Sequence, residues 1–112
     1  ASILSNQVIA VLDMGYTLLE DCGFTRDEAL RATGQLVMRN IENVLEAGCD
    51  GALTGPIERN DIETVKKHIA CMQNDDSDDV SLYKMLGTKL ANIAEKKNPD
   101  KDYTQMMELL RG

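Results

Sequence analysis

Residues 22–28 have the sequence Cys-Gly-Phe-Thr-Arg-Asp-Glu, in which a helix stop is followed at once by a helix start. Gly23 is typical of the left-handed residue that terminates a helix. Thr25 and Glu28 have the spacing of a capping box, in which the threonine hydroxyl accepts a hydrogen bond from the amide three residues later. The stretch therefore predicts one helix over residues 3–21 and a second over about 26–47.

The first of these helices is apolar in almost every direction. Its large apolar residues wrap nearly all round the predicted helix, which predicts burial on most sides against other helices or another subunit. Asp13, Glu20 and Asp21 mark the little surface left to water. The apolar residues are Ile3, Leu4, Val8, Ile9, Val11, Leu12, Met14, Leu18 and Leu19.

The rest of the chain shows the same helical spacing. Helices are expected over about 61–72, with Asn60 as the cap, and over about 79–97, followed by a short terminal helix. Their apolar positions are Ile62, Val65, Ile69 and Met72, then Leu82, Leu86, Leu90 and Ile93, then Tyr103, Met106, Met107 and Leu110. No segment alternates long enough to predict a strand. We predict an all-α bundle of about five helices, forming one domain over residues 1–112.

Composition and charge exclude several classes of function. The 112 residues carry 19 acids against 12 bases and a net charge of -7, which disfavours nucleic acid and anionic membranes as partners. No apolar run approaches the roughly 20 residues of a membrane span. Cys22, Cys49 and Cys71 are odd in number and far apart, so they predict free thiols in the cytoplasm, packed as small core residues.

Two candidate sites are weak on inspection. The acidic segment 74–79 has Asp79 where a calcium loop begun at Asn74 needs glycine, and Met85 where it needs glutamate. A solvated, helix-capping loop is the better interpretation, and we expect no metal site. His68 is the only histidine and has no partner in the sequence, which favours a structural or surface role.

Cofactor and catalytic motifs are missing as well. The sequence contains neither Gly-x-Gly-x-x-Gly nor Gly-x-x-x-x-Gly-Lys-Ser/Thr, and it has no nucleophile elbow. We therefore expect no catalytic residue in this chain and no cofactor bound by the chain alone.

Residues 48–60 form the one sustained irregular segment. It is longer than most connections between helices, and Leu53 and Ile57 are apolar residues that would anchor it. Gly55 and Asn60 suit a turn and a cap, whereas Thr54 and Arg59 have no such explanation. The residues alone leave two readings open, a plain connection or a binding loop.

This loop resembles a known family. Ala52-Leu53-Thr54-Gly55-Pro56 followed by Arg59-Asn60-Asp61 is similar to the Ala-Leu-Thr-Gly-Pro-x-x-Arg-Gly-Asp stretch of bacterial Rossmann-like proteins of unknown function, in which a helical domain follows an NAD(P)-binding domain. Order and spacing agree over most of residues 2–95. Asn60 departs from the glycine usual in the family.

The resemblance implies a fold and a role. The family is related to pyrroline-5-carboxylate reductase, ketopantoate reductase and 6-phosphogluconate dehydrogenase, whose C-terminal domains are helical, border the substrate cleft and form dimers. It implies that NAD(P) binds a Rossmann half of the parent protein that lies outside these 112 residues. Asn6, Thr54, Gly55 and Arg59 take the places of residues that face or hold a small anionic substrate, and Arg59 would grip its carboxylate. The alternative is that Arg59 forms a structural ion pair with Asp61 or across a dimer.

Two functions are therefore expected. The first is the substrate-binding and dimerisation domain of an NAD(P)-dependent oxidoreductase, a homodimer in which this chain binds and orients but does not transfer protons. The second is a stand-alone helical protein-interaction module whose methionine-rich faces accept a partner helix. These methionines are Met14, Met38, Met72, Met85, Met106 and Met107.

Overall fold

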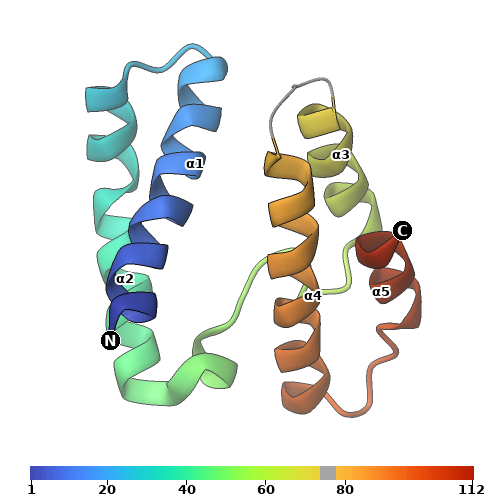
Figure 1. Cartoon of the computed structure of the whole chain (residues 1–112). Helices are drawn as coiled ribbons and strands as arrows, with labels where there is room; N and C mark the ends of the chain where they lie inside the picture. Colours follow the sequence, from blue (N-terminus) through green and yellow to red (C-terminus); the bar gives the residue numbers. More distant parts are fainter. Residues whose placement is uncertain (74–77) are drawn as a thin grey trace. The chain divides into compact units, whose positions relative to one another are not determined.

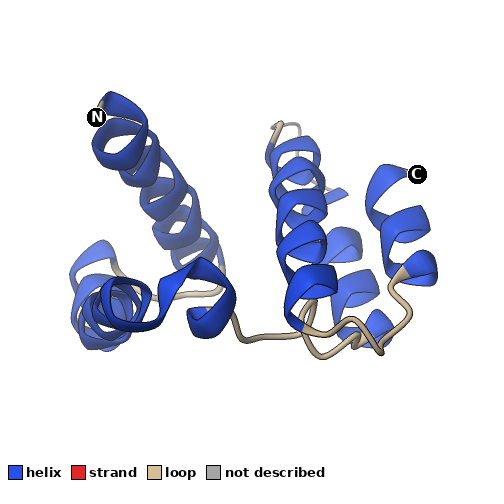
Figure 2. Cartoon of the chain, turned by 90° about the horizontal axis from the view of Figure 1, so that it is seen from below, coloured by secondary structure: helices blue, strands red, loops and turns tan. Residues whose placement is uncertain are grey.

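A computed structural model describes residues 1–73 and 78–112, and helices make up most of them (Figure 1). A π-helical turn, η1 (Ile3–Gln7), leads directly into α1 (Val8–Asp21). The other helices are α2 (Arg26–Ala52), α3 (Ile62–Gln73), α4 (Asp79–Lys97) and α5 (Thr104–Arg111). Figure 2 draws helices and loops and no strand in this described part. The predicted all-α class is confirmed.

Most helix boundaries agree with the sequence signals, and one differs. The predicted end of the second helix at Gly48 is a break, because that glycine has φ 78° and ψ 172°, but helical backbone resumes and α2 ends only at Ala52. The predicted irregular segment 48–60 is therefore helical in its first part. The loop proper begins at Leu53.

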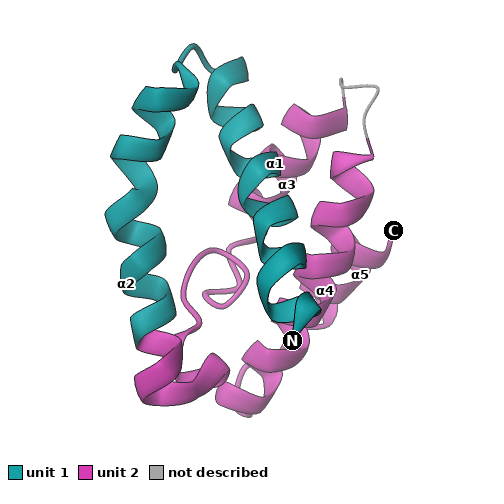
Figure 3. Ribbon diagram, turned by 60° about the vertical axis from the view of Figure 1, so that its left-hand side comes forward, with its two compact units in different colours: residues 1–42 teal, residues 43–112 magenta. Residues whose placement is uncertain are grey.

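Contacts divide the chain into two compact units, Ala1–Glu42 (unit 1) and Asn43–Gly112 (unit 2) (Figure 3). The boundary falls inside α2, so no linker composition marks it in the sequence. The expectation of one domain over residues 1–112 stays a prediction.

Unit 1 is a helical hairpin closed by the predicted stop and start. Gly23 has φ 103°, and the Phe24 amide donates to Leu19 O at 3.2 Å, which is the bond expected of a left-handed helix end. The Glu28 amide donates to Thr25 Oγ1 at 3.1 Å, as the capping box predicts.

Arg26 joins the two helices of this hairpin. Its guanidinium lies 3.2 Å from Asp13 Oδ1 and 2.7 Å from Glu20 Oε1, and it donates to Thr17 Oγ1 at 3.2 Å. Asp13 and Glu20, which the sequence marked as surface left to water, are thus paired with a cation.

Little of unit 1 is buried. Among its residues only Ala29 is buried, and no residue of η1 or α1 is. Large apolar side chains stand exposed instead, including Leu4 at 83% and Ile9 at 62%. The predicted burial of the first helix on most sides is not met within unit 1.

The core belongs to unit 2, where α4 packs against α3 and α5. The residues that α4 buries in this core are small: Gly87, Ala91 and Ala94. The predicted apolar positions of α4 lie on a different side of the helix, and Leu82 and Leu90 are exposed. The buried core residues are Ile57, Val65, Ile69, Ala91, Ala94, Tyr103, Met106 and Leu110.

Three sequence expectations concern the surface. All three cysteines are free and exposed, so their predicted packing in the core is wrong. Asp78 makes no side-chain cap to α4, because its near-helical backbone (φ −81°, ψ 9°) is not the extended conformation that capping requires. Residues 74–77 of the predicted acidic loop lie outside the described residues. Within the described ranges, no helix combines the length and apolarity that crossing a membrane requires.

Candidate functional site

The loop that follows α2 is a closed turn with a defined end. The Arg59 amide donates to Gly55 O at 3.0 Å, and the Asp61 amide donates to Pro56 O at 2.8 Å. The Asn60 amide donates to Ile57 O at 3.1 Å. The bonds from Asp61 to Pro56 and from Asn60 to Ile57, which span five and three residues, form the Schellman pattern that ends a helical turn.

Asn60 occupies the left-handed position of that pattern. Its φ is 61°, a conformation that glycine adopts freely and asparagine tolerates better than most residues. Asn60 thus adopts the conformation that a glycine at this place, as the resemblance implies, would adopt. Asn60 Nδ2 also donates to Asp102 O at 2.7 Å, which joins the loop to the segment before α5.

The cap of α3 is Asp61, so the sequence assignment of that cap to Asn60 is wrong. Asp61 Oδ1 accepts from the Thr64 amide at 3.2 Å, and Asp61 Oδ2 accepts from Thr64 Oγ1 at 2.7 Å. These hydrogen bonds from Thr64 lower the pKa of Asp61, burial opposes them, and the charges of Arg59 and Lys67 add to the lowering. The left-handed Asn60 cannot present its side chain to α3, because a capping residue needs extended backbone.

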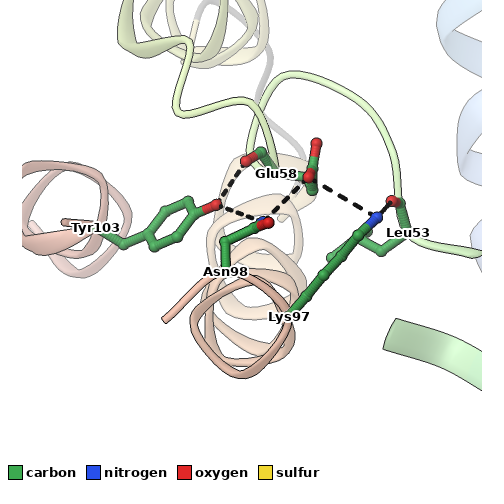
Figure 4. Close-up of polar contacts among 5 residues, drawn as sticks. All are labelled: Leu53, Glu58, Lys97, Asn98 and Tyr103. Carbon is green, nitrogen blue, oxygen red and sulfur yellow. Dashed lines mark hydrogen bonds and ion pairs between the residues drawn. The ribbon is translucent and has the colours of Figure 1, made fainter. Parts of the chain in front are cut away.

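Side chains from the end of α4 and the start of α5 hold the main chain of the loop (Figure 4). Tyr103 is 2% exposed, and its hydroxyl donates to Glu58 O at 2.6 Å. Lys97 Nζ donates to Leu53 O at 2.8 Å. Two carbonyls of the loop are thus satisfied by side chains that lie some forty residues later in the sequence.

The carboxylate of Glu58 points to the same group of side chains. Asn98 Nδ2 donates to Glu58 Oε1 at 3.1 Å and to the Tyr103 hydroxyl at 3.1 Å, which uses both hydrogens of its amide. Lys97 Nζ lies 3.8 Å from Glu58 Oε1. The hydrogen bond from Asn98 lowers the pKa of Glu58, burial opposes this, and the charges of Lys97, Lys101 and Arg59 lower it further.

The predicted substrate-binding residues of this loop face outward. Thr54 is exposed, Gly55 is half-buried with φ 98°, and the Arg59 side chain is 59% exposed. Arg59 Nη2 lies 4.0 Å from Asp61 Oδ2, the limit of an ion pair. The loop therefore presents a hydroxyl and a loosely paired guanidinium on a fixed main chain.

The structure brings together three of the four predicted residues. Thr54, Gly55 and Arg59 share this loop of unit 2, whereas Asn6 lies exposed in η1 of unit 1. The loop residues line neither of two cavities in unit 2, of about 530 and 420 Å³, that border α5. The substrate-binding roles of all four residues stay predictions.

His68 has the structural role expected of it. Its Nδ1 lies 2.9 Å from the Tyr83 hydroxyl, and the two rings meet edge to face. The contact joins α3 to α4, and burial raises the pKa of Tyr83. Among the described residues, no cluster of three or more potential metal ligands occurs.

Sequence reasoning missed Glu58, Lys97, Asn98 and Tyr103. The Asn98-Pro99 break and the apolar position of Tyr103 are visible in the sequence, but each has an ordinary local explanation. No local signal links Lys97, Asn98 or Tyr103 to a loop some forty residues earlier.

Comparison with known families gives one match. A family model described as a domain of unknown function, DUF2520, matches residues 1–90, which include the whole loop. The chain belongs to this family. No match occurs among curated proteins or among solved structures.

Substitution of Asn60 tests the left-handed turn. We expect Asn60→Ala to lower the free energy of unfolding by about 1 kcal/mol more than Asn60→Gly, because only the alanine pays for the positive φ. Both variants lose the bond to Asp102, so their difference isolates the backbone term. Urea denaturation followed by circular dichroism measures it, and equal losses would contradict the assignment.

Acidification tests the Glu58 contacts. Because the pKa of Glu58 is lowered in the folded chain, its ionised form adds stability above the unfolded value of about 4.3, and that contribution is lost as pH falls through the folded pKa. We expect wild type to be more stable than Glu58→Gln at neutral pH and the gap to shrink on acidification. Thermal denaturation at a series of pH values measures the gap; a gap independent of pH would contradict this role.

Proposed function

We propose that this member of the DUF2520 family is the helical C-terminal domain of an NAD(P)-dependent oxidoreductase, in which it binds substrate and forms a homodimer. The observation that carries the proposal is the loop 53–61, which holds Arg59 outward on a main chain fixed by Tyr103 and Lys97. The all-α fold and the resemblance of the loop to the C-terminal domains of such enzymes support it.

A small anionic substrate suits this loop. A guanidinium presents parallel N–H donors that match a carboxylate, and the Thr54 hydroxyl adds one more donor on the same loop. Arg59 gains little from Asp61, because that carboxylate is 4.0 Å away and already accepts two hydrogen bonds from Thr64. The role is binding and orientation, and no residue of the chain is assigned to proton transfer.

The cofactor belongs to another part of the parent protein. No glycine-rich phosphate loop occurs in the sequence, so these residues do not form a dinucleotide site, and we derive no step through NAD(P). The open position of Arg59, outside both cavities described in unit 2, suits a cleft completed by a cofactor domain. Three exposed free thiols support a cytoplasmic location.

Dimerisation is assigned to the exposed apolar side chains of unit 1. Ile3, Leu4 and Ile9 are between 62% and 83% exposed, and exposure of several large apolar side chains along one short segment favours an interface. We assign a second copy of the chain as the occupant, as the family resemblance implies. A stand-alone interaction module is the competing function, favoured by the exposed Met38 and Met85, which suit an adaptable interface.

The parent protein tests the enzyme assignment. We expect its reading frame to place about 130–150 residues with a glycine-rich strand–turn–helix ahead of Ala1, since that is the size of a dinucleotide domain. Fluorescence titration of that full-length protein should give saturable binding of NADH or NADPH. A parent that binds neither, or a reading frame that begins near Ala1, would favour the interaction module.

Sedimentation of the 112-residue chain tests the homodimer. We expect a dimer at micromolar concentration, and Ile9→Asp should shift it to monomer because the substitution buries a charge in the apolar contact. Leu45→Asp is the matched control, since Leu45 is 81% exposed and lies outside the proposed contact. A wild-type monomer, or equal dissociation by both variants, would contradict the assignment.

A further inference from the structure

Glu58 is the acid nearest to Arg59 in the sequence, and the direction of its carboxylate affects how much positive charge Arg59 presents. An exposed neighbouring acid would offer the guanidinium a partner. In the structure the carboxylate of Glu58 is instead engaged by Asn98 at 3.1 Å and lies 3.8 Å from Lys97 Nζ (Figure 4). Its side chain is 14% exposed.

We propose that Lys97 and Asn98 are positioning residues for ligand binding, because they engage the carboxylate of Glu58, which forms no ion pair with Arg59 within 4.0 Å, and so leave the guanidinium available to an anion. The inference rests on the proposed function, in which Arg59 grips a substrate carboxylate. Both residues follow the matched range 1–90, so the family match does not include them.

The main chain of the loop makes this separation possible. Tyr103 fixes the Glu58 carbonyl and Asn60 fixes the end of the turn, so residues 58 and 59 keep their relative orientation. The remaining acid near Arg59 is Asp61, whose carboxylate is committed to capping α3. Both acids beside Arg59 are thus occupied by other donors.

The effect expected from this arrangement is modest. Arg59 is 59% exposed, and solvent screens ion pairs at such positions. A Glu58 carboxylate released from Asn98 therefore competes with the ligand for Arg59, which weakens ligand binding but does not abolish it. Asn98→Ala is the variant that releases this carboxylate, because it removes the hydrogen bond to Glu58, together with the one to the Tyr103 hydroxyl, and keeps Lys97, whose Nζ also supports Leu53 O.

The test is an NMR titration of the 112-residue chain with sodium acetate as the carboxylate probe, at constant ionic strength. We expect saturable shifts of the Thr54, Gly55 and Arg59 signals. Asn98→Ala should raise the dissociation constant for acetate about two- to fivefold, which corresponds to the small free energy of an exposed ion pair. The double variant Asn98→Ala/Glu58→Gln should recover the wild-type value, and Asn92→Ala, at an exposed asparagine of α4, should not change it.

The recovery by Glu58→Gln separates positioning from a general loss of structure. A variant that merely loosened the loop would bind weakly with either residue at position 58. Unchanged acetate binding in Asn98→Ala, or no recovery in the double variant, would overturn the inference.

A second readout decides the case in which wild type binds no acetate. That result would contradict the proposed binding of an anion by Arg59. The effect of Asn98 on the pairing of Glu58 with Arg59 would then be measured without a ligand. The Arg59 side-chain Nε–H signal should then shift and exchange more slowly in Asn98→Ala, because Glu58 pairs with it, and should return in the double variant. An unchanged Arg59 signal would overturn the inference.

Discussion

The hydrogen bond from the buried Tyr103 hydroxyl to Glu58 O is the constraint on which the loop depends. The turn uses the carbonyls of Gly55, Pro56 and Ile57 for its own closure, and Glu58 O receives its donor from the start of α5. Loss of a partner at a fully buried carbonyl costs about 1–3 kcal/mol, and for this half-buried carbonyl a smaller cost of the same kind favours keeping α5 and the loop together. Asn98 then connects the same hydroxyl to the Glu58 carboxylate.

Apolar packing fixes the loop from its other side. Ile57 is 5% exposed and belongs to the same core as Met106 and Leu110. A Cβ on Gly87 would lie 3.2 Å from Ile57 Cδ1 and 2.8 Å from Leu110 Cδ2, so α4 packs closely against both side chains at this glycine. A connection held by its main chain and by its apolar residue is a rigid scaffold, which is what a binding residue on a loop requires.

Local signals were enough to predict the helices, and they failed where distant residues decide. Gly23 and Thr25 act within a few positions, so the hairpin could be read directly. Asn60 and Asp61 are both good caps, and only the closed turn shows which one has a positive φ. The hydrogen bonds from Asn98 and Tyr103 to Glu58 join positions 40 to 45 residues apart, which no local pattern encodes. Thr54, Gly55 and Arg59 are predicted on one loop because they lie close together in the sequence.

The face of α4 shows the limit of hydropathy as a guide to burial. Large residues were expected to point inward, but close packing against α3 and α5 selects Gly87, Ala91 and Ala94. Unit 1 shows the same difference between hydropathy and burial more strongly, because it is rich in leucine, isoleucine and valine and buries only Ala29. Helices gain most of their stability from packing an apolar face. Within unit 1 this source of stability is small, because its large apolar side chains stay exposed.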